Sequence, residues 1–191
     1  LQSEKFNNLK NSCLFSSYAI DWNIFKTFKR DWWKEYVIIE KCPIIYSRSS
    51  YGSDRPTYIS KIENEEYKYK IVHTIPKTGI RYLYSNCNNK GHFGVSKVIF
   101  GDNGLNDVVI DLDGKYGMSE NSMAIEVRDL EEANHIKKAL LSNKFNNIIK
   151  SMMFGNFRID WRIFTSFKRD WWKEYVNDET LIMSRHKDNE S

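Results

Sequence analysis

The chain has 191 residues, of which 41% are hydrophobic and 15% aromatic, and its formal net charge is +4 at pH 7. This length and apolar content predict a folded chain with a substantial core. Charged residues interrupt the apolar ones throughout, and no secretory signal opens the sequence, so we expect a cytoplasmic protein without a membrane segment. The three cysteines are odd in number and lack CxxC spacing, so the sequence supports neither a disulfide framework nor a zinc site and predicts reduced thiols.

One stretch occurs twice, with an offset of 139 residues. Residues 20–37 read IDWNIFKTFKRDWWKEYV and residues 159–176 read IDWRIFTSFKRDWWKEYV, and 21 of the 33 positions from 5 to 37 are identical to their partners. Two copies are too few for a solenoid, so they indicate a pair of similar elements around one different domain. All six tryptophans lie in these copies. A tryptophan beside Lys and Arg can stack on a base, but a block that occurs twice favours packing.

The repeats divide the chain into four expected parts. The fold class is α+β, with a central, mostly antiparallel β domain flanked by two helical, aromatic-rich elements. The parts are the first copy (1–37), which we interpret as the end of a preceding unit, the β-rich domain (38–143) with a closing helix over 130–143, the second copy (144–176) and a polar tail (177–191). Since the chain starts at Leu1 inside the repeat, we expect it to be a fragment of a longer protein.

The predicted elements follow in chain order. Apolar spacing predicts an amphipathic helix in residues 1–17, and Asp21 occupies the N-cap position of the next helix. From Ile38 the chain becomes polar and rich in turns. Alternation of apolar and polar residues predicts strands over 68–75 and 80–84, and apolar runs predict further strands over 95–100, 107–112 and 122–128. The first strand is expected to form a hairpin with the second, and the third with the fourth. Asp129 and Glu132 form a capping box that starts a helix continuing toward Phe145.

Charge is distributed unevenly within the central domain. Residues 48–97 contain nine Lys or Arg against four Asp or Glu, whereas residues 98–132 contain two against nine. Two solvated faces of opposite sign would account for this as well as an anionic partner would. A DNA-reading module needs cations for phosphates, and donors and acceptors on loops for base edges. The candidate DNA-binding residues are Arg48, Arg55, Lys77, Arg81, Asn86, Asn88, Lys90, His92 and Lys97.

Catalytic motifs are absent from the sequence. It has no Gly-rich phosphate loop, no GxSxG and no HExxH, and its four histidines are unpaired in sequence. A metal-dependent nuclease would use Asp111 or Asp113 with Glu126, and Arg128 in place of the usual lysine; alternatively, these residues flank a turn or face water. The run from Asp111 begins like a calcium loop but lacks the rest of the pattern. We therefore predict no catalytic and no metal-binding residues.

Several runs resemble a known family. YKIVHTIPKTGIRYLY (69–84), GHFGVSKVIF (91–100), VIDLDGKYGM (109–118) and residues 130–145, followed by FRIDWRIFTSFKRDWW (157–172), are similar to the C-terminal target-recognition part of type IIG-like N6-adenine DNA methyltransferases. The resemblance covers roughly 40–176. It implies a sequence-specific reader of double-stranded DNA that works with a methyltransferase or endonuclease domain or subunit.

What the chain lacks relative to this family is also informative. The Asn-Pro-Pro-Tyr box and the glycine motif for S-adenosylmethionine are absent. We therefore expect no methyl transfer by this chain alone and no cofactor within it, S-adenosylmethionine being bound by an associated catalytic domain. The paired aromatic elements also resemble the helical spacers of specificity subunits.

Two other functions remain open from the sequence. The duplicated aromatic blocks could be docking surfaces of a protein-interaction or assembly module, in which the β domain is only a scaffold. The acidic residues near position 111 leave a metal-dependent nuclease fragment as a third alternative.

Overall fold

The structure is a computed structural model that describes residues 40–152 and 158–176. The first repeat copy with its expected helices, Asp21 and the polar tail lie outside the described residues. In chain order the elements are β1 (Ile44–Ile45), α4 (Arg55–Tyr58), β2 (Ile59–Ser60), β3 (Tyr69–Thr74), β4 (Arg81–Ser85), β5 (Lys97–Gly101), β6 (Val108–Asp111), β7 (Gly117–Met118), β8 (Ser122–Glu126), α5 (Leu130–Leu141), α6 (Asn143–Met152), α7 (Arg162–Thr165) and the 3-10 helix η2 (Trp171–Glu174).

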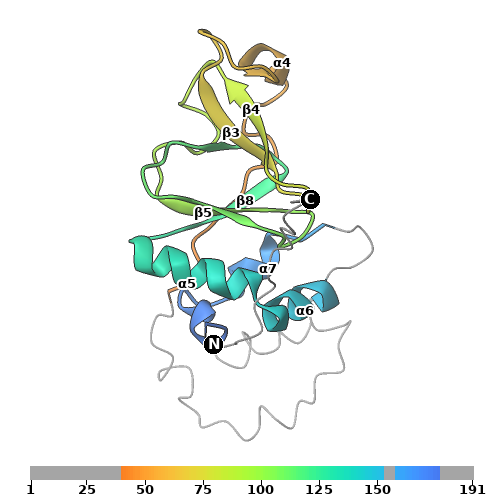
Figure 1. Ribbon diagram of the computed structural model, residues 1–191, viewed down its shortest axis with the longest axis vertical. Helices are drawn as coiled ribbons and strands as arrows, with labels where there is room; N and C mark the ends of the chain where they lie inside the picture. Colours follow the sequence, from red (N-terminus) through yellow and green to blue (C-terminus); the bar gives the residue numbers. More distant parts are fainter. Residues whose placement is uncertain (1–39, 153–157, 177–191) are drawn as a thin grey trace, which may run out of the picture. The chain divides into compact units, whose positions relative to one another are not determined.

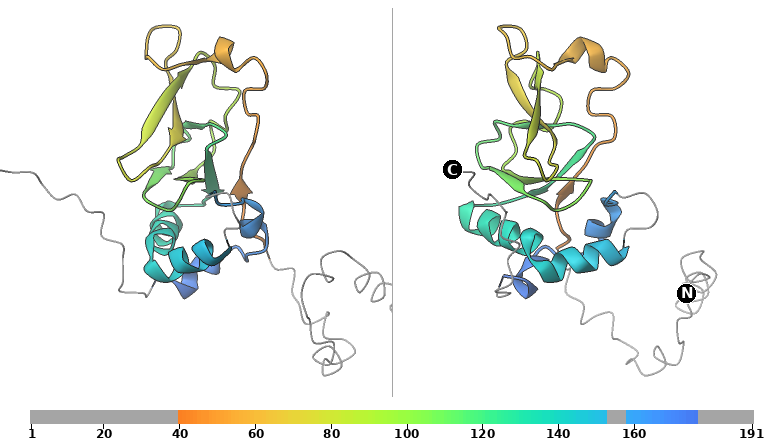
Figure 2. Two further views of the ribbon diagram at one scale, coloured as in Figure 1. Left: turned by 90° about the vertical axis from the view of Figure 1, so that its right-hand side faces the viewer. Right: turned by 45° about the vertical axis from the view of Figure 1, so that its right-hand side comes forward.

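The strands form two sheets of four strands each. The first, here called the helix-side sheet, has the order β1-β8-β5-β6 and is antiparallel throughout. The second, the outer sheet, has the order β2-β4-β3-β7, in which only β3 and β7 run parallel. Helices α5 and α6 lie beneath the helix-side sheet, and the outer sheet lies on its other side (Figures 1 and 2). Two mostly antiparallel sheets with helices on one side agree with the predicted α+β class.

Strand β5 is at the centre of the core, and all five of its residues are buried. Val98 and Phe100 belong to the apolar cluster shared with the helices, while Ile99 belongs to the cluster shared with the outer sheet. Successive side chains of a strand point to opposite faces, so residues 98–100 contribute side chains to both apolar clusters. The outer sheet is thereby fixed to a scaffold that is covered by helices on its other face.

The closing helix begins where the capping box predicts. Asp129 accepts a hydrogen bond from the backbone nitrogen of Glu132 at 2.8 Å, so the N-cap of α5 is confirmed. The helix does not continue toward Phe145. Ser142 has extended backbone angles, and its hydroxyl oxygen accepts a hydrogen bond from Phe145 at 3.2 Å, which starts α6. Serine competes for backbone groups in this way, and that is why it separates two helices here.

The second repeat copy packs its aromatic residues into the same core. Trp171 lies 4.4 Å from Phe145 between ring centroids, and Trp172 stacks on His135 at 4.8 Å. Both tryptophans are less than 10% exposed. Rings of this size bury large apolar areas, so in the second copy these residues hold α6, α7 and η2 against α5 and the helix-side sheet.

Both predicted hairpins are confirmed, because β3 pairs with β4 and β5 with β6 in antiparallel register. The predicted strand near residue 122 is also present as β8. Four short elements were not predicted from the sequence, namely β1, α4, β2 and β7. Each has only two to four residues, too few to show a periodic pattern. None of the helices in the described residues has the length and apolar character needed to cross a membrane.

Candidate nucleic-acid interface

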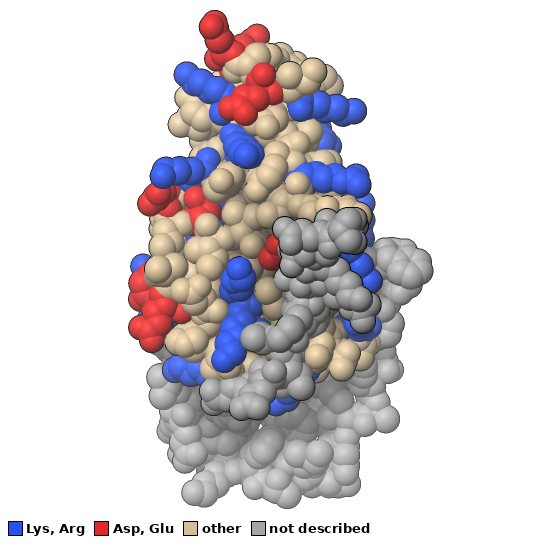
Figure 3. Space-filling model, viewed as in Figure 1, with Lys and Arg blue, Asp and Glu red and all other residues tan. Residues whose placement is uncertain are grey.

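The exposed candidates lie on turns and loops at both ends of the hairpin formed by β3 and β4. Lys77 is in the turn that joins the two strands, Arg81 is the first residue of β4, and Asn88 lies in the loop that follows it. Arg48 is exposed in the turn before α4. In Figure 3, Lys and Arg are spread over the half of the molecule that contains the outer sheet, while Asp and Glu gather at its outer tip and along one side. No ion pair of Lys77 or Arg81 is present within the described residues.

Lys97 does not belong to this surface, and its prediction as a DNA-binding residue is wrong. The side chain has no exposed area. Its ammonium group donates to Asp111 at 2.8 Å and to the backbone oxygen of Val95 at 3.1 Å. Burial lowers the pKa of Lys97, and the hydrogen bond to Asp111 opposes this change. A lysine enclosed in this way cannot reach a phosphate, so it has a structural role.

The same ion pair removes the main support for a nuclease. The Asp111 carboxylate also accepts hydrogen bonds from the backbone nitrogens of Lys115 at 2.8 Å and Tyr116 at 3.0 Å. Asp113 is exposed and pairs with Lys115 at 2.6 Å. In residues 40–152 and 158–176, no three His, Cys, Asp or Glu side chains are grouped closely enough to hold a metal ion. The oxygens of Asp111 are therefore engaged in fixing the loop after β6.

Two candidates hold the loop after β4 against the segment of α4 and β2. Asn86 donates from its side-chain amide to the backbone oxygen of Thr57 at 3.1 Å. Lys90 places its ammonium group 4.7 Å from the centre of the Tyr58 ring. The amide donor of Asn86 is thus used internally, whereas Lys90 stays half-exposed beside the exposed Asn88. This end of the outer sheet presents a cation and a free amide next to each other.

His92 has an unusual backbone conformation, with φ of +62°. It lies between Gly91, whose backbone oxygen accepts a hydrogen bond from Met118 at 2.7 Å, and Gly94, whose nitrogen donates to Gly114 at 2.9 Å. A side chain with positive φ is uncommon and is kept here by these contacts on both sides. Burial, followed by the charge of Lys97, lowers the pKa of His92. The ring is half-buried and offers little surface to a partner.

Another group of polar side chains lies around His73, which was interpreted from the sequence as a lone histidine. Here the His73 cluster means Arg55, His73, Arg81, Ser119, Glu120 and Asn121. Arg55 forms an ion pair with Glu120. The ring nitrogen Nδ1 of His73 lies 2.8 Å from the hydroxyl oxygen of Ser119. Burial lowers the pKa of His73, the charges of Arg55 and Arg81 lower it further, and Glu120 opposes them.

The His73 cluster extends to the second repeat copy through Asn121. The side-chain oxygen of Asn121 accepts a hydrogen bond from Arg158 at 3.4 Å, and Arg158 also pairs with Asp102 at 3.2 Å. The adjacent Ile159 donates from its backbone nitrogen to Asp102 at 2.6 Å. Arg55 and Arg81, from distant segments, therefore act on the charge of His73, and Arg158 joins the cluster through Asn121. The signal in the sequence was limited to the position of His73 inside a predicted strand.

Tyrosines and a lysine cover another part of the outer sheet. The ammonium group of Lys70 lies 4.2 Å from the centre of the Tyr82 ring, and the rings of Tyr82 and Tyr116 are 6.1 Å apart. Burial, then the neighbouring Tyr116, raises the pKa of Tyr82. All three side chains are half-buried. Such cation–aromatic groups can bind stacked or anionic ligands, and here they adjoin the loop fixed by Asp111.

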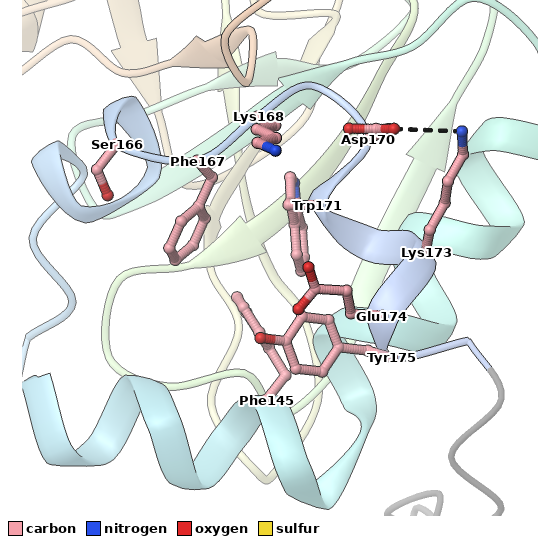
Figure 4. Close-up of a pocket in the computed structure, with 9 residues that line it drawn as sticks. All are labelled: Phe145, Ser166, Phe167, Lys168, Asp170, Trp171, Lys173, Glu174 and Tyr175. Carbon is pink, nitrogen blue, oxygen red and sulfur yellow. Dashed lines mark hydrogen bonds and ion pairs between the residues drawn. The ribbon is translucent and has the colours of Figure 1, made fainter. Parts of the chain in front are cut away.

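One cavity of about 420 Å³ lies within the second repeat copy (Figure 4). Its wall combines Phe145, Phe167, Trp171 and Tyr175 with the exposed ion pair of Asp170 and Lys173, 3.2 Å apart. Burial raises the pKa of Tyr175. The cavity contains no pair of groups arranged as nucleophile and base, so it does not indicate an enzymatic site.

Comparisons of the chain with models of protein families, with curated proteins and with solved structures find no match.

Proposed function

We propose that this chain is a sequence-specific target-recognition module for double-stranded DNA. The observation that carries the proposal is the exposure of Lys77 and Arg81 at one end of a hairpin anchored to a covered sheet. Arg81 also belongs to the His73 cluster, and Asn88 and Lys90 lie at the other end of β4. Loops held by a rigid sheet are where binding residues usually occur.

The types of residue suit the two tasks of DNA recognition. Lysines such as Lys77 and Lys90 neutralise phosphates, which gives affinity without sequence choice. Asparagine side chains such as Asn88 pair with base edges in two-point contacts. The resemblance to the recognition part of N6-adenine DNA methyltransferases supports the same conclusion.

The proposed partner is a methyltransferase or endonuclease domain or subunit of a restriction–modification system. It would bind S-adenosylmethionine and carry out the chemistry, since the motifs for both are absent from this chain. The two similar aromatic elements would flank the recognition domain as helical spacers. In the second copy Trp171 and Trp172, two of the three tryptophans, are buried in their own domain, which favours this role over a docking surface of an assembly module.

A selection from random duplex DNA at two salt concentrations tests the proposal. We expect the wild-type chain to recover a sequence motif. A variant with Lys77, Arg81, Asn88 and Lys90 changed to Ala should lose it, and its binding should become less dependent on salt. Each lost phosphate contact lowers the slope of log affinity against log salt by about 0.9.

The matched control removes three cations from the helix side. Lys138, Lys144 and Lys150 are exposed on α5 and α6, and their replacement by Ala changes the net charge by the same amount. We expect this control to keep the motif. Recovery of no motif by the wild type, or an equal loss in both variants, would contradict the proposal.

A further inference from the structure

His73 stands at an irregular point of the outer sheet. The pairing of β3 with β4 shifts between Val72 and Thr74, so that Val72 faces Tyr82 and Thr74 faces Arg81. His73 is the extra residue of this β-bulge. A bulge turns a side chain away from the regular alternation and is frequent beside functional sites. The imidazole is half-buried rather than part of an apolar cluster.

The hydrogen bonds of Ser119 fix which ring nitrogen carries the proton. The Ser119 hydroxyl donates its single proton to the backbone oxygen of His73 at 3.0 Å. Nδ1 of His73 lies 2.8 Å from the same hydroxyl oxygen, and with the hydroxyl proton on the backbone oxygen we assign Nδ1 as the donor. The contact of Nδ1 with the Asn121 amide nitrogen is longer, 3.5 Å, and at the limit of a hydrogen bond. With its proton on Nδ1, the neutral ring has an unprotonated Nε2.

The surroundings favour this neutral form and leave Nε2 available. Partial burial and the charges of Arg55 and Arg81 disfavour the imidazolium, with Glu120 as the opposing charge. Within the described residues Nε2 makes no hydrogen bond, and it is not among the buried polar atoms that lack a partner. It is thus an accessible acceptor within the His73 cluster.

We propose that Nε2 of His73 reads one base of the target by accepting a hydrogen bond from an exocyclic amino group. This inference rests on the proposed function and specifies its chemistry at one position. In the major groove only adenine N6 and cytosine N4 offer such a donor, whereas guanine and thymine present acceptors there. Arg81, which is exposed at the start of β4, is placed to hold a flanking phosphate. The site should therefore contain a position restricted to adenine or cytosine.

Binding of the full chain to DNA duplexes that differ at single base pairs tests this proposal. For the wild type we expect at least about a tenfold preference for adenine or cytosine at one position. In His73→Ala that preference should disappear while the other positions and the salt dependence stay unchanged. In His73→Gln, whose amide oxygen can accept a hydrogen bond, part of the preference should return. Arg81→Ala serves as the contrast, because it should reduce the salt dependence.

A second measurement does not depend on DNA. Long-range proton–nitrogen NMR spectra should show the proton of His73 on Nδ1 in the wild type, and a mixture of both tautomers in Ser119→Ala. The Ser119→Ala variant should also weaken the single-base preference. If a thermal melt shows that the His73→Ala variant is not folded, the His73→Gln and Ser119→Ala variants test the role of His73 instead.

The two proposals fail in different ways. A wild-type chain that recovers no motif refutes the DNA-reading function itself. A wild-type motif that is unchanged in His73→Ala, or a proton found on Nε2, overturns only the role of His73.

Discussion

Lys97 and Asp111 show how one buried pair determines a local structure. The lysine has no exposed area, and the aspartate is 3% exposed. Asp111 also accepts two backbone hydrogen bonds from the loop after β6. An ionised group in an apolar interior is tolerated only when it is paired in this way. The pair fixes the loop that carries Tyr116 beside the lysine–tyrosine group of the outer sheet.

Replacing the buried lysine tests its structural role. Lys97→Met should lower the free energy of unfolding by about 3–5 kcal/mol, because it leaves the charge of Asp111 buried without a partner. Denaturation with urea measures the change. The control is Lys115→Met, which breaks the exposed pair with Asp113 and should have no measurable effect. Similar losses of unfolding free energy in both variants would show that the effect does not depend on burial of the ion pair.

The two described cysteines should differ in reactivity. Burial raises the pKa of the Cys42 thiol to about 12, with a smaller opposing effect of the nearby Trp171 side chain. Only the thiolate reacts with iodoacetamide, so at about pH 8 Cys42 should be alkylated far more slowly than the half-buried Cys87. Peptide mass spectrometry reads both sites, and in denaturant their rates should become equal. Equal alkylation rates of Cys42 and Cys87 in the folded chain would contradict this prediction.

The raised thiol pKa also has a consequence for stability. A folded-state pKa above the unfolded value stabilises the protein below the unfolded pKa, and this contribution is lost as pH rises toward the folded value. For Cys42 the loss therefore belongs to alkaline solution, above about pH 9. The residue packs in the apolar cluster beneath the helix-side sheet.

At the scale of elements, hydrogen bonds at the termini decide where helices begin and end. Asp129 caps α5, and Ser142 separates it from α6. Glu132, in the first turn of α5, accepts hydrogen bonds from the backbone and guanidinium of Arg128 and lies 3.5 Å from Arg169 of the second copy. The start of α5 is thereby also the point where the second copy is attached.

Loss of the cap should weaken α5 by a predictable amount. Asp129→Ala should lower the free energy of unfolding by about 1 kcal/mol, because the backbone nitrogen of Glu132 loses its acceptor. Glu131→Ala is the matched control, since it removes an exposed acid from the same turn that does not act as the cap. Its effect should stay within about 0.5 kcal/mol. Calorimetric or chemical unfolding that ranks Glu131 above Asp129 would contradict the assigned cap.

At the scale of the whole molecule, the second repeat copy completes the core of the β domain. Its Phe145, Phe164 and Trp171 belong to the same apolar cluster as Val98 and Phe100 of β5. The corresponding residues of the first copy, at an offset of 139, are Phe6, Phe25 and Trp32. The most marked difference at a buried position is Ile149, which is 2% exposed and corresponds to Lys10.

A chimera tests whether the two copies are equivalent for packing. In it, the sequence of residues 5–37 replaces residues 144–176. We expect it to fold but to be destabilised, chiefly because a lysine then occupies position 149. The single change Ile149→Lys should cost about 3 kcal/mol, and restoring isoleucine in the chimera should recover most of the loss. A chimera that stays unfolded after this restoration would show that the copies are not interchangeable.

The sequence by itself determined the elements with local signals. Strands β3 and β4 show the two-residue alternation of a strand, β5, β6 and β8 contain short apolar runs, and the cap of α5 depends on residues three positions apart. The exposure of Lys77 also followed from local chemistry, because Pro76 to Gly79 form a turn. Such features depend on neighbours along the chain and can be read without the fold.

Only the tertiary structure decided which polar residues act together. Lys97 lost its predicted role because its strand lies between β6 and β8, where Asp111 becomes its partner. The His73 cluster was invisible in the sequence because Arg55, Arg81 and Ser119 come from separate segments that the outer sheet brings together. Pairing between distant strands sets these contacts, and a side chain's burial and charge environment arise only when the strands meet.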